Sequence, residues 1–249
     1  FFFLFFLFLS FELFAWNAFF SDEEYAFSNY PESISSPGLV FQHQFNKKRF
    51  RIFYHHKNIM DEHMNIMFSL TNPTEKTVVV NIQKGLGGSS KDVVFAGHKA
   101  LVDFFQDILS EGELITLPPQ STIPVLSHKI KSNQTSSGIV RFDTFEDADL
   151  SLKMMVLDSN YSNLTGFIDV PSRVSQFRVS YFDESIREIK KVFDLSDKYT
   201  SFEIGGKPFL KDKTSNFLLK GNYGLVYGIE IFLTNFEDNY QNVEFFLAP

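Results

Sequence analysis

Apolar and polar residues alternate with a period of two along much of the chain, which is the pattern of half-buried β-strands. The pattern is clearest in Met64–Ile82, where an alternating run is followed by the sequence NPTEK and then by a β-branched run. Proline cannot donate to a ladder, and asparagine and threonine side chains satisfy turn backbone, so we expect a β-hairpin here. Tyr227–Leu247 repeats this design near the C-terminus. The two related stretches predict two β-sandwich domains.

Further alternating runs give the expected domains their extent. Candidate strands of the first domain lie at 50–54, 114–117, 122–130, 137–142 and 150–157. Together with the hairpin they make about seven strands, which is typical of an immunoglobulin-like sandwich. We therefore expect a mostly β protein with one such domain over 39–170 and a second over 171–249. The second offers only about five strands, with 186–192 ambiguous between helix and strand, so we expect it to be incomplete.

The connection after the first hairpin combines a glycine-rich stretch with one helix. Apolar residues recur at i, i+3, i+4, i+7 and i+8, at Leu101, Phe104, Phe105, Ile108 and Leu109. This spacing predicts a short amphipathic helix over about 98–109, inserted in the first domain. The preceding stretch, 84–92, predicts a flexible glycine loop, because a phosphate-binding loop needs Gly-Lys-Ser/Thr at the start of a helix. Ser89 or Ser90 with Asp92 and His98 has the residue types of a hydrolytic triad, but no nucleophile-elbow sequence surrounds either serine.

The N-terminal residues have the composition of a targeting segment. Residues 1–20 are apolar except for Ser10, Glu12 and Asn17, which is typical of the apolar region of a signal peptide. A retained membrane anchor is the alternative, since about 20 residues can span a bilayer, although Glu12 would cost about 3 kcal/mol near the bilayer centre. Residues 21–38 are acidic and rich in proline and serine, so they predict a linker.

Charge and cysteine content exclude several classes of function. The net charge is −7, and the longest Lys/Arg run is Lys47-Lys48-Arg49, so a nucleic-acid partner is not expected. The chain contains no cysteine, which removes disulfide bonds, thiol catalysis and thiolate metal sites.

Two groups of side chains are candidates for binding. His55, His56, Met60 and His63 form a His/Met group of the ligand types that Cu(I) accepts, so a periplasmic copper site is one alternative. A structural role at a strand end and in a turn explains the same residues without a metal, and we expect no cofactor. Aromatic residues on a sandwich surface can stack on sugars, which makes a carbohydrate-binding module the other alternative. The tyrosines available for it are Tyr161, Tyr223, Tyr227 and Tyr240.

Four segments follow one another in an order that resembles a known family. They are Arg49–His56, Leu70–Pro73 with the strand at 78–82, Leu117–Ser121, and Lys220–Tyr227, which contains Gly-Asn-Tyr-Gly. The family is an uncharacterised secreted bacterial family, mainly cyanobacterial and known only as a domain of unknown function, or a sister family of it. The resemblance implies an exported β-rich protein whose chain continues past Pro249, and it supplies no catalytic residues.

The sequence thus predicts an exported, non-enzymatic protein with a structural or interaction role in the cell envelope or outside the cell. We expect it to be secreted, periplasmic or on the cell surface, with envelope polysaccharide or other envelope proteins as partners. Contact with a membrane is expected only through residues 1–20, if they are not cleaved.

Overall fold

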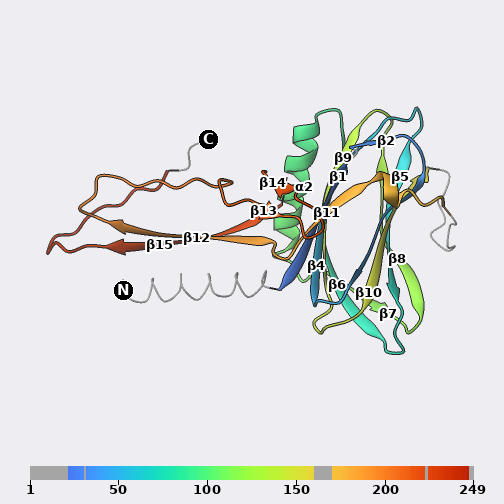
Figure 1. Cartoon of the computed structure of the whole chain (residues 1–249), viewed down its shortest axis with the longest axis horizontal. Helices are drawn as coiled ribbons and strands as arrows, with labels where there is room; N and C mark the ends of the chain where they lie inside the picture. The colour runs from blue at the N-terminus through green and yellow to red at the C-terminus, as the bar shows by residue number, and fades with distance from the viewer. Residues whose placement is uncertain (1–21, 31, 160–169, 222–223, 247–249) are drawn as a thin grey trace. The chain divides into compact units, whose positions relative to one another are not determined.

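A computed structural model describes residues 22–30, 32–159, 170–221 and 224–246 of the chain (Figure 1). The protein is mostly β and divides into two compact units. The sandwich unit comprises Asp22–Ser185 and Leu210–Leu219, and the C-terminal unit comprises Ile186–Phe209 and, as far as it is described, 220–246. Among the described residues, no helix is long and apolar enough to cross a bilayer. The predicted targeting segment, residues 1–20, lies outside the described residues and stays a prediction.

The sandwich unit contains two β-sheets whose inner faces form one hydrophobic core. The larger sheet has the order β11-β1-β4-β9-β6-β7, with β2 beside β4, and the smaller has the order β3-β10-β5-β8. The strands are β1 Glu23–Tyr30, β2 Ser33–Ile34, β3 Gly38–Phe45, β4 Arg49–Asn58, β5 Met64–Asn72, β6 Val78–Ser90, β7 Glu113–Leu117, β8 Ser121–Ile130, β9 Thr135–Asp143, β10 Leu150–Asp158 and β11 Arg178–Phe182. A two-stranded hairpin of β13 Leu210–Lys211 and β14 Leu218–Leu219 belongs to the same unit.

The alternation of apolar and polar residues with a period of two determines which side chains form the core, as the sequence predicts. Phe50, Ile52 and Tyr54 on β4 are completely buried and contribute to the same core cluster as Ile66 and Phe68 on β5. The residues between them, Arg51 and Phe53, therefore lie on the outer face of the larger sheet.

The prediction of a hairpin over Met64–Ile82 is wrong. β5 lies in the smaller sheet and β6 in the larger one, so the turn between them crosses the core as an arch. The same holds for β7 and β8, which flank the Pro118-Pro119 turn. From β3 to β11 the chain changes sheet at every connection except that between β6 and β7. A turn of about five residues fits both a hairpin and an arch, so alternation and turn residues alone do not distinguish them.

Two domain boundaries predicted from the sequence are also wrong. Residues 23–30 form β1 inside the larger sheet, paired with β4 and β11, rather than part of a linker over 21–38. The acidic residues at the start of this segment suggest a solvated chain, but Glu23 is buried, and Tyr25 is buried beside it. Because β11 pairs with β1, the sandwich unit extends past the predicted boundary at Pro171 to Ser185.

The glycine-rich stretch is part of strand β6, and the helix after it begins earlier than predicted. Helix α2 spans Val93–Asp107, and its N-cap Asp92 accepts hydrogen bonds from the backbone N–H groups of Val94 and Phe95, both at 3.0 Å. The helix packs on the outer face of the larger sheet (Figure 1). A Cβ atom on Gly85 would lie 2.1 Å from the carbonyl oxygen of Ala100 on α2. Glycine is therefore required here because it lets the helix backbone approach the strand.

The buried face of α2 differs from the predicted one. Ala96, Ala100 and Phe104 are buried against the sheet, whereas Phe105 and Leu109 are exposed. Two small alanines complement the glycines of β6, and this close contact was not visible in the pattern of large apolar residues.

The C-terminal unit contains a two-stranded parallel sheet of β12 Ile186–Asp194 and β15 Val226–Thr234. The ambiguous segment 186–192 is thus a strand. The returning strand predicted near 242–247 is not formed over the described residues 241–246. A second immunoglobulin-like sandwich over 171–249 is therefore not confirmed.

Candidate functional site

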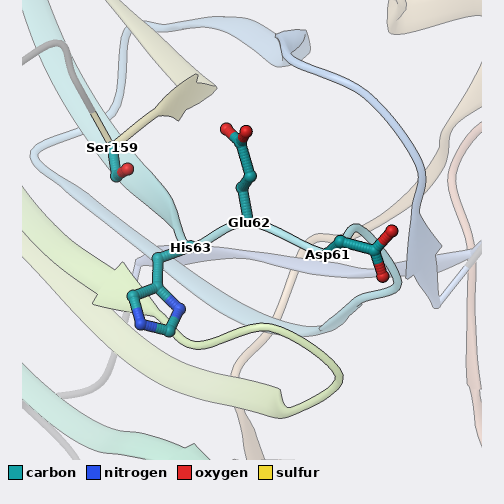
Figure 2. Close-up of a pocket in the computed structure, with 4 residues that line it drawn as sticks. All are labelled: Asp61, Glu62, His63 and Ser159. Atoms are coloured by element: carbon teal, nitrogen blue, oxygen red, sulfur yellow. The ribbon is translucent and has the colours of Figure 1, made fainter.

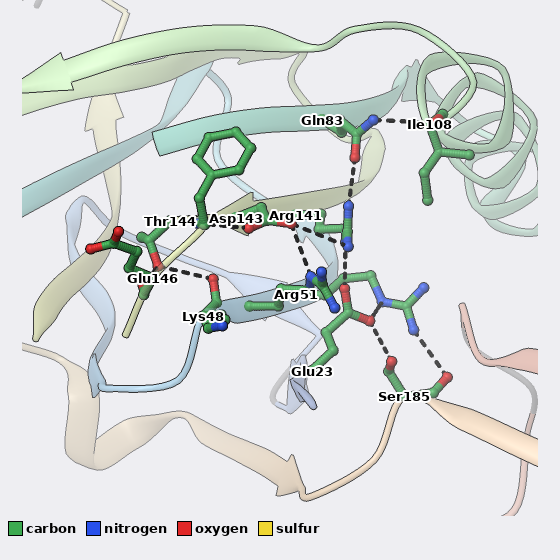
Figure 3. Close-up of polar contacts among 12 residues, drawn as sticks. Glu23, Lys48, Arg51, Gln83, Ile108, Arg141, Asp143, Thr144, Glu146 and Ser185 are labelled. Carbon is green, nitrogen blue, oxygen red and sulfur yellow. Dashed lines mark hydrogen bonds and ion pairs between the residues drawn. The ribbon is translucent and has the colours of Figure 1, made fainter. Parts of the chain in front are cut away.

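The outer face of the larger sheet carries a buried ionic cluster, which we define as Glu23, Arg51, Gln83, Arg141 and Asp143 (Figure 3). The strand registers bring it together: Arg51 on β4 lies opposite Arg141 on β9, which lies opposite Gln83 on β6. These residues occupy the alternate row to the apolar core residues, so they face away from the smaller sheet.

Glu23 is the centre of the cluster. Its Oε1 accepts a hydrogen bond of 2.7 Å from Nε of Arg141, and its Oε2 lies 3.2 Å from Nε of Arg51. All three side chains are at most 1% exposed. Breaking such a buried ion pair by removing one partner costs about 3–5 kcal/mol, because the remaining charge stays buried. Glu23 therefore fixes β1 beside β4 and β9.

The cluster connects four strands with helix α2. Nη1 of Arg141 donates to Oε1 of Gln83 at 2.8 Å, and Nε2 of Gln83 donates to the carbonyl oxygen of Ile108 at 3.2 Å, directly after α2. Nη2 of Arg51 donates to the carbonyl oxygen of Ser185 at 3.0 Å, and the guanidinium carbon lies 5.3 Å from the ring centroid of Tyr25. Such stacking accommodates a desolvated guanidinium.

The chemistry of the cluster is that of a structural ion network. Arg49 adds a third guanidinium, which donates to Oδ2 of Asp143 at 2.9 Å. Burial lowers the pKa of Arg141, an effect that the nearby carboxylate of Glu23 opposes. The contacts therefore assign these residues to holding the sheet and α2 together.

A second polar group closes the side of the sandwich where β1 and β3 meet the 210–219 hairpin. Glu24 contacts Nε2 of His43 at 3.4 Å and accepts from Nζ of Lys213 at 3.1 Å. The hydrogen bond with His43, together with the contact with Lys213, lowers the pKa of Glu24 to about 2 against the opposing effect of burial. The His43 ring lies 4.7 Å from that of Tyr181. This group joins the hairpin to the sandwich.

The structure does not bring the predicted His/Met group together. His55 and His56 are consecutive on β4 and so face opposite sides: His55 Nδ1 contacts Oγ of Ser137, and His56 Nε2 contacts Oγ of Ser28 at 3.0 Å. His63 accepts from the backbone N–H of Ser132 at 3.1 Å. Burial lowers the pKa of His55.

Met60, the remaining member of that group, packs partly against the core cluster. Among the described residues, no three His, Cys, Asp or Glu side chains gather closely enough to hold a metal ion. The three histidines of the group instead contact serine hydroxyls and the backbone.

His128, which sequence reasoning did not select, lies in a strongly perturbed environment. His128 on β8 lies 3.2 Å from the hydroxyl of Tyr54, and its Nε2 lies 2.9 Å from Oγ of Ser136. Burial lowers the pKa of His128 to about 4. A Cβ atom on Gly138 would lie 2.2 Å from the Tyr54 hydroxyl, so glycine provides the space for it. The group connects the two sheets across the core.

A surface pocket lies at the connection between β4 and β5 (Figure 2). Asp61, Glu62, His63 and Ser159 line it. The side chains of Asp61, Glu62 and His63 point in different directions (Figure 2), so they do not converge on one ligand position.

The other candidates from the sequence are dispersed. Tyr240 is exposed, whereas the hydroxyl of Tyr227 accepts a hydrogen bond of 3.2 Å from Arg187. Tyr161 and Tyr223 lie outside the described residues. The residues of the imagined triad have other roles: Oγ of Ser89 donates to the carbonyl oxygen of Lys129, and Asp92 caps α2.

Sequence reasoning missed the ionic cluster. Arg49 and Arg51 alternate with core residues on β4, a pattern that is typical of a solvent-exposed row, yet Arg51 is completely buried. The available signal was the match of two charged alternating segments, Arg49-Phe50-Arg51 and Arg141-Phe142-Asp143. Their pairing also needed Glu23, which lies 118 residues from Arg141.

Comparison of the chain with protein-family models, curated proteins and solved structures gave no match. The resemblance to an uncharacterised secreted bacterial family therefore stays a prediction.

Proposed function

We propose that the chain is an exported, non-enzymatic protein of the cell envelope or extracellular space with a structural or interaction role. The observation that carries this proposal is the exposed apolar surface of the C-terminal unit. Its large exposed side chains are Val192, Tyr199, Phe202, Ile204, Phe232, Phe236, Tyr240, Phe245 and Phe246. Exposed apolar side chains are the residue type that contributes most to sites that bind other macromolecules.

The small size of the described C-terminal sheet supports an interaction role. Two strands alone are marginally stable in water, and β12 and β15 pair with no other strand among the described residues. In contrast, the buried charged groups of the sandwich unit, such as Glu23, Arg51 and Arg141, contact one another across its own strands. The sandwich unit is therefore suited to being a rigid support, and the C-terminal unit to binding.

The finer parts of the proposal follow from the sequence. They are export directed by residues 1–20, two immunoglobulin-like sandwich domains, and envelope partners. Of these partners we favour other envelope proteins over polysaccharide, because strand edges and exposed phenylalanines complement another β-sheet.

Co-sedimentation tests this function. The purified chain is mixed either with isolated envelope proteins in detergent-free vesicles or with protein-free envelope polysaccharide, and the pelleted fraction is measured. We expect binding to the protein-containing fraction, and we expect Phe236→Ser with Phe246→Ser to reduce it at least tenfold. Leu109→Ser, an equally exposed position on α2 in the sandwich unit, is the matched control and should bind normally.

Binding to polysaccharide alone would instead favour the carbohydrate-binding alternative, and binding to neither would refute the proposal. Mass spectrometry of the native protein tests export separately. Loss of residues 1–20 is expected, and an intact Phe1 would favour a membrane anchor.

A further inference from the structure

Two turns in different units share one pattern of hydrogen bonds. In the turn after β5, Nδ2 of Asn72 donates to the carbonyl oxygen of Lys76 at 2.7 Å, and Oδ1 of Asn72 accepts from the N–H of Thr74 at 3.1 Å. In the turn after β15, Nδ2 of Asn235 donates to the carbonyl oxygen of Asn239 at 2.8 Å, and Oδ1 accepts from the N–H of Glu237 at 3.0 Å. Both asparagines follow a Leu-Thr pair.

The residues before the two turns also correspond. When the two asparagines are aligned, the inward row of β5 matches one face of the β12/β15 sheet. The matched pairs are Met64 with Tyr227, Ile66 with Ile229, Phe68 with Ile231, and Leu70 with Leu233. β12 adds Ile189 and Phe193 to the same face, beside Ile229 and Leu233. This face also carries Arg187 and Lys191, beside Tyr227 and Ile231. The other face carries the ion pair of Lys190 with Glu230, together with Val192 and Phe232.

The residues after the turns correspond as well, but their burial differs. Val80 and Ile82 on β6 match Val243 and Phe245. In the sandwich unit, Val80 and Ile82 belong to the same core cluster as the inward row of β5. In the C-terminal unit, Phe245 is 67% exposed, and the matching row of β15 is only half-buried. Residues 227–246, which we call the second arch because of this correspondence, therefore contain the residue types of both halves of such a core, but leave them uncovered within their own copy.

We propose that residues 240–246 of one copy pack, in a second copy, across the face of β12 and β15 that carries Ile229 and Leu233, and that the exchange is reciprocal. Each copy has both the acceptor face and the apolar segment that fits it, so a two-fold exchange satisfies both copies at once. The first arch shows that these residue types pack together when the arch is closed.

The turn at Asn235 is suited to act as the hinge. The first turn contains Pro73, and the N–H of Gln120 donates to the carbonyl oxygen of Thr74 at 3.1 Å, which ties that turn to the β7–β8 connection. The second turn has Phe236 at the position of Pro73, and Phe236 is 84% exposed. Exchange of identical elements between copies occurs where a hinge loop is not fixed in the closed form.

This inference rests on the proposed interaction function and names a second copy as the partner. The chain contains no cysteine, so single cysteines report contacts without background. Tagged Leu233→Cys and untagged Val243→Cys chains are mixed, oxidised and separated on a non-reducing gel. We expect a disulfide-linked heterodimer at least tenfold above that formed by Val192→Cys with Val243→Cys, because Val192 lies on the other face of the sheet.

The double variant with both Leu233→Cys and Val243→Cys distinguishes exchange from closure. An internal disulfide in a monomer would overturn the proposal, because the segment would then close on its own copy. If neither an internal nor an intermolecular disulfide forms, the correspondence of the two arches is overturned.

Light scattering coupled to gel filtration gives an independent test. We expect the unmodified 249-residue chain to be a dimer. Phe245→Asp should weaken the dimer at least a hundredfold, and Phe246→Asp, in the alternate row, should leave it nearly unchanged. A monomeric chain that still sediments with envelope proteins would refute the exchange alone. A monomeric chain that does not sediment with them would refute the proposed function as well.

Discussion

The two arches of this protein have the same turn but different surroundings. The arch from β5 to β6 is enclosed by strands on both sides, since β5 lies between β10 and β8 and β6 between β9 and β7. The arch after β15 has β12 as its one paired neighbour among the described residues. The same Leu-Thr-Asn sequence forms the same side-chain hydrogen bonds in both. A local sequence thus determines the turn, whereas burial depends on which strands lie beside it.

Truncation of a matched core residue should show the largest difference between the arches. Phe68→Ala removes a completely buried ring, so we expect the free energy of unfolding to fall by about 3–5 kcal/mol. Ile231→Ala, at the matching half-buried position, should cost about 1 kcal/mol. Urea unfolding monitored by circular dichroism measures the first, and hydrogen exchange of the β15 amides measures the second. Equal costs would mean that both arches are equally well packed.

The ion pairs of the two units should differ almost as much in their contribution to the free energy of unfolding. Glu23→Gln removes the carboxylate that Arg51 and Arg141 share, and we expect a loss of about 3–5 kcal/mol. Glu230→Gln removes an exposed pair in which Nζ of Lys190 lies 3.3 Å from the carboxylate, and should cost less than about 0.5 kcal/mol. Chemical denaturation of both variants checks this. A small effect of Glu23→Gln would show that the cluster is not a structural connection.

The two turn asparagines allow a narrower comparison. Asn72 is completely buried, and its Nδ2 also donates to the carbonyl oxygen of Pro118 at 3.0 Å. Asn72→Ala therefore leaves buried carbonyl groups without a donor and should cost about 2–3 kcal/mol. The exposed Asn235 should tolerate alanine at a cost of about 0.5 kcal/mol. Thermal unfolding of both variants, with Asn239→Ala as a control for the second turn, tests the comparison.

Acid should destabilise the sandwich unit more than the C-terminal unit. All six histidines lie between His43 and His128, so the C-terminal unit contains none. The pKa of His128 falls from 6.5 to about 4 on folding, so between these values the unfolded chain binds more protons. Stability is therefore lost as the pH falls from 6.5 to 4, and His128→Gln should flatten this part of the profile. Unfolding free energies at several pH values provide the measurement, and an unchanged slope in the variant would contradict it.

The sequence predicted individual strands well and their partners poorly. Alternation located β4, β5, β8, β9 and β10 within a few residues, because one face of each strand is buried in the core. It did not assign strands to sheets, since a short turn connects hairpins and arches equally well. Buried charge was also missed: Glu23 belongs to an acidic run that resembles a solvated segment, and its arginine partners come from distant strands.

Close packing was the third property that the sequence did not show. Gly85 was expected in a flexible loop, because the sequence does not reveal that Ala100 of a later helix packs against it. In the C-terminal unit, the likeness of the two arches was visible in the sequence, but the difference in their burial was not.

The order of strands in the sandwich unit has a consequence for folding during synthesis. Glu23 and Ser185 are 162 residues apart, yet the hydroxyl of Ser185 donates to the Glu23 carboxylate, and β1 gains its outer neighbour only when β11 has been made. At translation rates of about 5–20 residues per second, this takes about 10–30 s. Folds dominated by such distant contacts also form slowly. A chain that cannot complete its first strand early therefore remains incompletely folded until most of the sandwich unit has been synthesised.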